Sequence, residues 1–209
     1  CLMPRLDSLL EIGMHSLKIE GRNKTEYYAA ITARSYRQAI DAWRRDPQNW
    51  SPDLYMQELH TLQNRGYCLG FYEGHLTALS QNYEYTRTLG DWLFAGSIVD
   101  WQGDDIIFEV RNYINCGEFI EFLLPGSLEN IRLTLSQFQD AESGEITSRV
   151  SAGQGKKIRI PAAAFGTDAA ELRRKLPQYT IARKPADLKE DNARMLNRKK
   201  EEFEQLCSD

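Results

Sequence analysis

The spacing of apolar residues divides the chain into a helical first part and a β-rich second part. Apolar residues recur at helical intervals in three stretches and predict helices there: 2–12, about 25–43 and about 52–63. Gly13 is expected to end the first helix, because glycine adopts the left-handed conformation that follows many helices. Thr25 or Asn23 is expected to cap the second, since either side chain accepts a hydrogen bond from a free backbone N–H.

A short apolar run, Ser16–Ile19, lies between the first two predicted helices and predicts a buried strand. Its far end carries Lys18, Glu20 and Arg22 and opens into the second helix. Charged groups at the carboxyl end of a strand that leads into a helix are typical of a βα unit in an α/β barrel, where they face the active site. One such unit cannot bury its own faces, so the chain is expected to be a fragment of a larger fold.

Seven β-rich runs follow Trp92, separated by turn signals: 92–99, 105–111, 118–124, 130–137, 146–150, 156–160 and 178–183. Short strands at near-even spacing predict a small closed barrel or a sandwich. Thr167 or Asp168 is expected to cap a short helix before the last strand. Residues 64–90 are rich in Gly and Tyr and predict an ordered connector with buried rings. The charged residues 186–209 predict a solvated helix or a frayed tail.

Composition narrows the class of protein. The 209 residues are 42% hydrophobic and 27% charged, as in globular proteins, and the net charge of −4 gives no overall attraction to nucleic acid. No apolar run approaches the ~18 residues of a membrane span. The four cysteines are scattered, and the three histidines share no ligand spacing with carboxylates. Free thiols and no metal site in this chain are therefore expected.

The alternating charges Lys18, Glu20 and Arg22 have two interpretations. At the mouth of a barrel, the Arg and Lys side chains could bind an anionic substrate while Glu20 orients Arg22 or acts as a base. Charge alternation is also common in structural clusters of ion pairs, which would only seal the end of the barrel. Spacing alone favours the structural interpretation.

The β-rich part carries aromatic and basic residues that are candidates for RNA contact, namely Trp101, Arg111, Lys156, Lys157 and Arg159. Such residues on a small barrel could bind RNA through phosphate contacts and stacking. The alternative is a solvated barrel face with core aromatics, which the composition favours because this part is not basic overall. No Ser/His/Asp or Cys/His arrangement indicates a nucleophile.

Residues 15–24, HSLKIEGRNK, are followed by YY, TARSYRQAID, LQNRGYCLGF, EGH and QNYEY. Together these blocks resemble the collagenase-like peptidase family of unknown catalytic type, family thirty-two of the U class. Within that family they resemble the branch that forms 5-hydroxyuridine at the tRNA wobble position with prephenate. The resemblance covers residues 1 to about 183.

The resemblance implies an α+β protein, a C-terminal βα piece of a (β/α) barrel followed by a small all-β barrel. The expected parts are a truncated catalytic barrel, a connector, the β-barrel and a charged helical or disordered tail, at 1–64, 65–91, 92–185 and 186–209. Lys18, Glu20 and Arg22 then border the active site, Lys18 and Arg22 neutralising an anionic ligand and Glu20 orienting Arg22. None of the four cysteines matches the family's iron–sulfur ligands, which lie in an upstream block.

The implied function is that of the C-terminal portion of a cytoplasmic tRNA hydroxylase, with prephenate as co-substrate and the β-barrel assisting tRNA binding. Its partners are then tRNA and the upstream barrel portion, with neither membrane nor DNA, and the chain alone is expected to be inactive. Two alternatives stay open. One is part of a peptidase, as the family's name suggests, and the other is a non-catalytic RNA-binding module.

Overall fold

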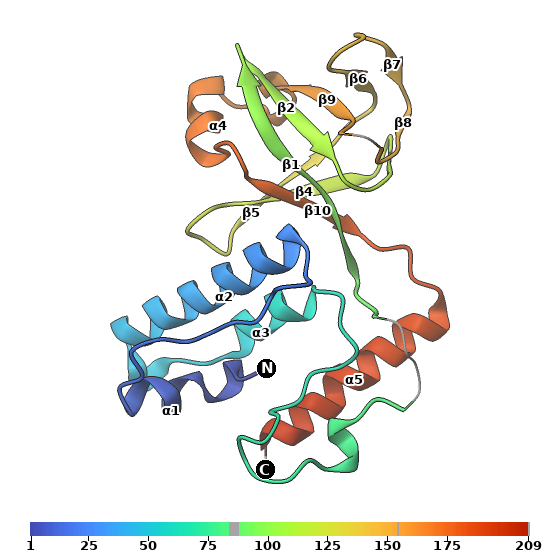
Figure 1. The fold of residues 1–209 in the computed structure, drawn as a ribbon. Coiled ribbons are helices and arrows are strands. Elements are labelled where there is room, and N and C mark those ends of the chain that lie inside the picture. The colour runs from blue at the N-terminus through green and yellow to red at the C-terminus, as the bar shows by residue number, and fades with distance from the viewer. Residues whose placement is uncertain (84–87, 154, 209) are drawn as a thin grey trace. The chain divides into compact units, whose positions relative to one another are not determined.

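The computed structural model describes residues 1–83, 88–153 and 155–208 (Figure 1). The chain forms two compact units, one of residues 1–91 with 186–209 and one of residues 92–185. Glu84 and Tyr85, which belong to the QNYEY block, lie outside the described residues. None of the described helices combines the length and apolar character that a membrane crossing requires.

The first unit is helical. Its α-helices and 3₁₀ turns are η1 (Met3–Arg5), α1 (Leu6–Glu11), α2 (Glu26–Arg45), η2 (Pro47–Asn49), α3 (Asp53–His60), η3 (Ala78–Ser80) and α5 (Glu190–Ser208). The three helices predicted near the N-terminus are confirmed. The Thr25 hydroxyl caps α2 by accepting the Tyr28 N–H, and Gly13 follows α1 with a φ of +76°.

Helices α2 and α3 pack side by side (Figure 1). Their buried faces carry Ile31 on α2 and Leu59 on α3, as the periodicity predicts. The Arg34 guanidinium on α2 and the Glu58 carboxylate on α3 also form a largely buried ion pair of 3.1 Å. Two helices with one shared apolar face therefore make the frame of the first unit.

The prediction of a strand at Ser16–Ile19 is wrong. These residues are irregular, and the described part of the first unit contains no strand that could pair with them, only an isolated bridge between Asn64 and Leu89. A strand exists only through hydrogen bonds to a neighbour, so an apolar run without one stays irregular. The described residues accordingly show no βα unit and no piece of a (β/α) barrel.

The connector differs from the expectation of buried rings. The Phe71 and Tyr83 side chains are 75% and 82% exposed, and Tyr72 is also exposed. Tyr67 does pack, since its hydroxyl donates to the Leu59 carbonyl over 2.8 Å. The Gly-rich sequence between these rings forms turns, which give the exposed rings no neighbouring surface to cover them.

The C-terminal residues form α5, which is helical as one alternative expected but is not solvated along its length. Leu196 and Phe203 are buried, and the Phe203 ring lies 5.8 Å from Tyr67 and 6.1 Å from His60, centroid to centroid. The Lys200 ammonium pairs with Asp91 over 3.0 Å. Leu196 and Phe203 are seven residues apart and therefore lie on the same face of the helix. This apolar face packs against the rest of the first unit, although most of the segment is charged.

The second unit is built on an eight-stranded sheet in the order β5-β4-β10-β1-β2-β9-β6-β7, with β3 and β8 forming a separate pair. Its elements are β1 (Trp92–Gln102), β2 (Asp105–Val110), β3 (Ile114–Asn115), β4 (Phe119–Leu123), β5 (Asn130–Thr134), β6 (Phe138–Asp140), β7 (Ile146–Thr147), β8 (Arg149–Val150), β9 (Lys157–Pro161), η4 (Ala162–Phe165), α4 (Ala169–Lys175) and β10 (Ile181–Pro185).

All seven predicted β-rich runs contain strands, and Asp168 caps α4 by accepting from Ala170 and Glu171. Closure of the barrel is not observed: the order ends at β5 and β7, which do not pair with each other in the described residues. The sheet curls into a half-barrel instead (Figure 1). Three-residue and two-residue strands such as β6 and β7 are too short to complete the hydrogen-bonded wall that a closed barrel needs.

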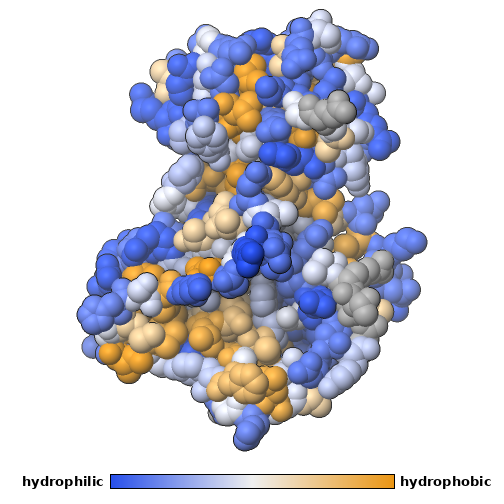
Figure 2. All heavy atoms as spheres, viewed as in Figure 1, coloured by the Kyte–Doolittle hydropathy of each residue, from blue (hydrophilic) through white to orange (hydrophobic). Residues whose placement is uncertain are grey.

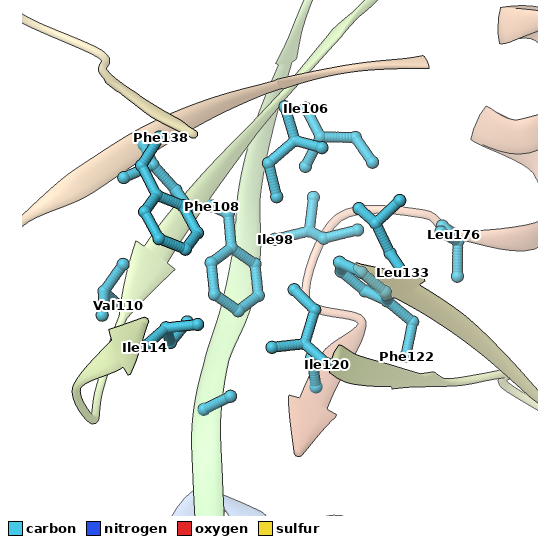
Figure 3. Close-up of a cluster of buried hydrophobic side chains, with 14 of the residues drawn as sticks. Ile98, Ile106, Phe108, Val110, Ile114, Ile120, Phe122, Leu133, Phe138 and Leu176 are labelled. Carbon is cyan, nitrogen blue, oxygen red and sulfur yellow. The ribbon is translucent and has the colours of Figure 1, made fainter. Parts of the chain in front are cut away.

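The concave side of this sheet holds one apolar core (Figure 3). Residues alternate along β2, so that Ile106, Phe108 and Val110 point inward. The Phe108 and Phe122 rings meet edge to face at 5.7 Å. Gly96 on β1 allows the close approach of β2, because a Cβ there would lie 2.0 Å from the Glu109 carbonyl oxygen.

Candidate functional site

The segment between α1 and α2 carries the three charged residues singled out by the sequence. Lys18, Glu20 and Arg22 are all exposed. Glu20 Oε1 accepts a hydrogen bond of 3.0 Å from the Arg22 backbone N–H. The expected orientation of the Arg22 guanidinium by Glu20 is absent, since no ion pair joins these side chains in the described residues. Glu20 therefore holds the turn of the backbone.

Tyr28 on α2 anchors the same turn from the helix side. Its hydroxyl donates to the Glu20 carbonyl over 3.2 Å. Gly21 lies against the ring, so that a Cβ at this position would sit 3.4 Å from the nearest ring carbon. The turn is thus fixed against the start of α2 by one hydrogen bond and one close packing contact.

A cavity of about 310 Å³ opens beside this turn, within the first unit. Its lining includes one cationic side chain and a wall of apolar and aromatic groups, among them Leu17, Lys18, Ile19, Tyr28, Tyr36 and Tyr67. Ile12, Met14 and Ile19, in and before this turn, are exposed apolar side chains. Figure 2 shows apolar side chains gathered on the face of the first unit that it views. Of the three predicted residues, Lys18 lines the cavity, whereas Glu20 and Arg22 do not.

Lys18 is the one lysine or arginine among the described residues that line the cavity, and the lining contains no carboxylate. Burial raises the pKa of Tyr36 to about 12, although hydrogen bonds from the backbone of Leu2 and Met3 oppose the shift. Burial also raises the pKa of Tyr67. Both phenols therefore stay protonated near neutral pH. An apolar, aromatic-lined hollow with a lysine at its edge suits a small ligand that has an apolar body and an anionic group.

The described residues contain no group of three or more His, Cys, Asp or Glu side chains placed to hold a metal ion. The four cysteines are free and half-buried, with Cys116 in the second unit and the other three in the first. Iron–sulfur clusters need several thiolates directed at one point. Among the described residues, the cysteines form no such group of three.

Three of the four basic RNA candidates in the second unit are paired with carboxylates. Arg159 lies 3.1 Å from Asp105, Arg111 lies 3.5 Å from Glu109, and Lys156 pairs with Asp140. The Lys156 ammonium and two backbone N–H groups hold the pKa of the Asp140 carboxyl well below its ordinary value. Ion pairs of this kind lower the net positive charge that these residues present to a phosphate.

Trp101 and Lys157 differ from those three. The Trp101 ring is half-buried, its Nε1–H donates to the Leu176 carbonyl over 2.9 Å, and the Arg173 guanidinium lies 5.0 Å from its centroid. Its face is thus already occupied by a cation. The Lys157 ammonium forms no ion pair within the described residues.

Sequence reasoning missed Tyr179. This residue lies between α4 and β10 with a φ of +70° and a side chain that is 75% exposed. Positive φ is rare for residues other than glycine, asparagine and aspartate, so a tyrosine gives no sequence signal for it. The exposed segment 173–175, Arg-Arg-Lys, shortly precedes it.

A helical unit with an aromatic-lined cavity and a half-barrel β unit define a two-part α+β protein. Residues 1–82 match the profile of peptidase family U32, and residues 91–183 match that of the peptidase family U32 C-terminal domain. The chain belongs to peptidase family U32. The strand-free turn carrying Lys18 lies in the first match and the half-barrel in the second.

Similar proteins include tRNA hydroxylation protein P of Escherichia coli, 36% identical over 159 residues, and its namesake in Haemophilus influenzae, 31% identical over 161 residues. Each alignment covers 75% of this chain and 34% of the relative, so the chain spans about a third of the curated relatives' length. In a solved structure, the C-terminal domain of a Geobacillus thermoleovorans protein described as a U32 peptidase aligns with a TM-score of 0.33 and 18% identity, over 45% of this chain and 92% of that one.

Proposed function

We propose that this chain is the C-terminal portion of a cytoplasmic tRNA-modifying enzyme that hydroxylates the wobble uridine to 5-hydroxyuridine. The observation that carries the proposal is the 159-residue similarity to a protein named for tRNA hydroxylation. That aligned length exceeds either of the two units, so the likeness is not limited to one module.

The cavity beside Lys18 supports a role in binding the proposed co-substrate. Prephenate is a ring that carries carboxylates, so its ring would pack against Tyr28 and Tyr36 while Lys18 pairs with a carboxylate. Arg22 stands exposed at the same turn and would bind a second anionic group, either of this ligand or of the tRNA backbone. Glu20 would keep the turn in place through its bond to the Arg22 N–H.

The proposed enzyme also contains an iron–sulfur cluster. No three cysteines of the described residues are placed to hold a metal ion, so all cluster ligands would come from the upstream barrel portion and no step would fall to this chain's thiols. The half-barrel unit would assist in holding tRNA. Its charge is nearly balanced, with eleven Lys and Arg against twelve Asp and Glu in residues 92–185, so binding would rest on local contacts.

The test is deletion of the gene that encodes this chain, followed by mass spectrometry of nucleosides from total tRNA. We expect 5-hydroxyuridine and its derivatives to disappear and to return with the intact gene. Rescue with Lys18→Met should fail or be weak. Lys24→Met is the matched control, because Lys24 is a nearby exposed lysine whose ammonium lies 5.6 Å from the centroid of the Tyr28 ring but which does not line the cavity.

The same strain distinguishes the alternative functions. Unchanged hydroxyuridine together with altered peptide turnover would refute the proposal and favour a peptidase, in line with the 35% identity over 72 residues to an uncharacterized protease of Methanocaldococcus jannaschii. Hydroxylation of purified tRNA by the 209-residue chain alone would refute the assignment of the chain as an inactive portion.

A further inference from the structure

We propose that Tyr179, with the basic end of α4, forms a stacking site for one unpaired nucleotide of RNA. The inference rests on the proposed function, because that function supplies the RNA. Tyr179 is not among the RNA-contact residues predicted from the sequence, and stacking on its ring is a contact that the proposed function does not specify.

The first support is the backbone of Tyr179. A φ of +70° is unfavourable for a residue with a Cβ and a bulky ring, and such positions cost about 1–3 kcal/mol. The conformation is imposed by β1: the Tyr179 N–H donates to the Ile98 carbonyl over 2.7 Å, and Gln178 Nε2 donates to the Val99 carbonyl over 2.7 Å. Glycine or asparagine would make the same turn with less strain.

The second support is the position of the ring. Tyr179 is 75% exposed, whereas Thr180, the next residue, and Leu176, three residues earlier, are buried. In the described residues the Tyr179 side chain forms neither a hydrogen bond nor a ring contact. An aromatic ring displayed to water on a rigid turn adds little to folding, since it buries no apolar surface. Its backbone is, however, already held by the bond to β1, so that only side-chain rotation remains to be lost when a flat partner stacks on the ring.

The third support is the run of basic residues that shortly precedes Tyr179 in the sequence. Arg173, Arg174 and Lys175 form the last turn of α4. Arg173 is engaged with Trp101, and Lys175 pairs with Glu171 over 2.7 Å. Arg174 is exposed and forms no ion pair in the described residues, although its charge also acts on the Glu171 carboxylate. It precedes Tyr179 by five residues in the sequence. Proteins hold single-stranded nucleic acid by such combinations, in which an exposed ring stacks on a base and a cation binds the backbone.

The experiment measures binding of a short fluorescein-labelled oligouridylate to the full chain by anisotropy at low salt. We expect Tyr179→Ala and Tyr179→Gly to weaken binding about tenfold, the loss typical of one stacked base, and Tyr179→Phe to retain it. Tyr179→Gly should also raise the melting temperature, because it relieves the positive φ. Loss of affinity in a more stable protein separates binding from folding.

Ile146→Ala is the matched control, because Ile146 is an exposed apolar residue of the same unit, 58% exposed, that belongs to neither α4 nor its turn. Arg174→Ala should reduce the slope of log affinity against log salt by about one. Equal affinity of the wild type and Tyr179→Ala overturns the stacking site and leaves the proposed function intact. Failure of the wild-type chain to bind oligouridylate also overturns the stacking site. The proposed function is decided separately, by the amount of 5-hydroxyuridine in tRNA from the deletion strain.

Discussion

The Arg183 guanidinium and the Glu121 carboxylate meet at 2.7 Å across the neighbouring strands β10 and β4, and each side chain is only 4% exposed. Asn130 and Arg132 donate to the same carboxylate over 3.1 and 2.8 Å. The Arg183 guanidinium also lies 4.3 Å from the centroid of the Trp92 ring. The charges are thus paired and surrounded by donors, which compensates the cost of taking them out of water.

Removing one partner of this pair leaves a buried charge without compensation. We expect Glu121→Ala to lower the free energy of unfolding by about 3–5 kcal/mol. Arg132→Ala removes a second bond to the same carboxylate, but Arg132 is 65% exposed and should cost at most about 1 kcal/mol. Urea denaturation followed by tryptophan fluorescence measures both. Equal losses in the two variants would contradict a dominant role for Arg183.

Gly96 is expected to tolerate no side chain. A Cβ at this position would meet the Glu109 carbonyl oxygen at 2.0 Å and the Phe108 ring at 2.7 Å, so β1 and β2 would have to separate. Gly96→Ala should destabilise the second unit by about 3 kcal/mol, at the upper end for overpacking. Ser97→Ala, at the next position of β1, should change the midpoint little. Similar midpoints for the two variants would refute the close contact.

Docking of α5 depends on Phe203. This ring is 2% exposed and contacts Tyr67 and His60 by its edge. Phe203→Ala should cost the first unit about 3–5 kcal/mol, as for other buried aromatic residues. Phe71→Ala is the control, because Phe71 is exposed. Hydrogen exchange should show faster exchange along α5 in the first variant alone, and unchanged protection would contradict the docking.

His60 gives the first unit a dependence on pH. Burial, and to a lesser extent the charge of Lys200, lowers its pKa from the ordinary 6.5 to about 4. Between these values the unfolded chain binds a proton that the folded chain does not, so acidification favours unfolding. The stability is complete above pH 6.5 and decreases as the pH falls towards 4.

The measurement for His60 is the urea midpoint as a function of pH. His60→Phe keeps an aromatic ring in contact with Tyr67 and Phe203 and should flatten the curve over this interval. His75→Gln is the control, because His75 lies on the exposed connector. A wild-type curve that is already flat would contradict the prediction.

Much of the secondary structure could be read from the sequence because its causes are local. The Thr25 cap of α2 and the Asp168 cap of α4 are set by the side chain at one position. The prediction of a strand at Ser16–Ile19 was wrong because the formation of a strand is not decided locally. A strand needs a hydrogen-bonded neighbour, and no local pattern shows whether one is present. The half-barrel likewise follows from which distant strands pair.

The candidate site was predictable only in part. Lys18 could be chosen because a charge follows an apolar run, but the cavity that it lines brings together Leu9, Tyr36 and Tyr67 from different segments. The pairing of Arg159 with Asp105 depends on the register of β2 and β9. The strain at Tyr179 comes from hydrogen bonds to β1. Each of these is a tertiary property.

The return of α5 to the first unit makes the half-barrel an insertion. Its first and last strands, β1 and β10, run antiparallel with Trp92 opposite Pro185, and just outside them the Ala186 N–H donates to the Asp91 carbonyl over 2.8 Å. The chain therefore leaves and re-enters the helical unit at one point. A module whose two ends are adjacent can be replaced by a short linker, or exchanged for a homologous module, without distorting the backbone of the helical unit.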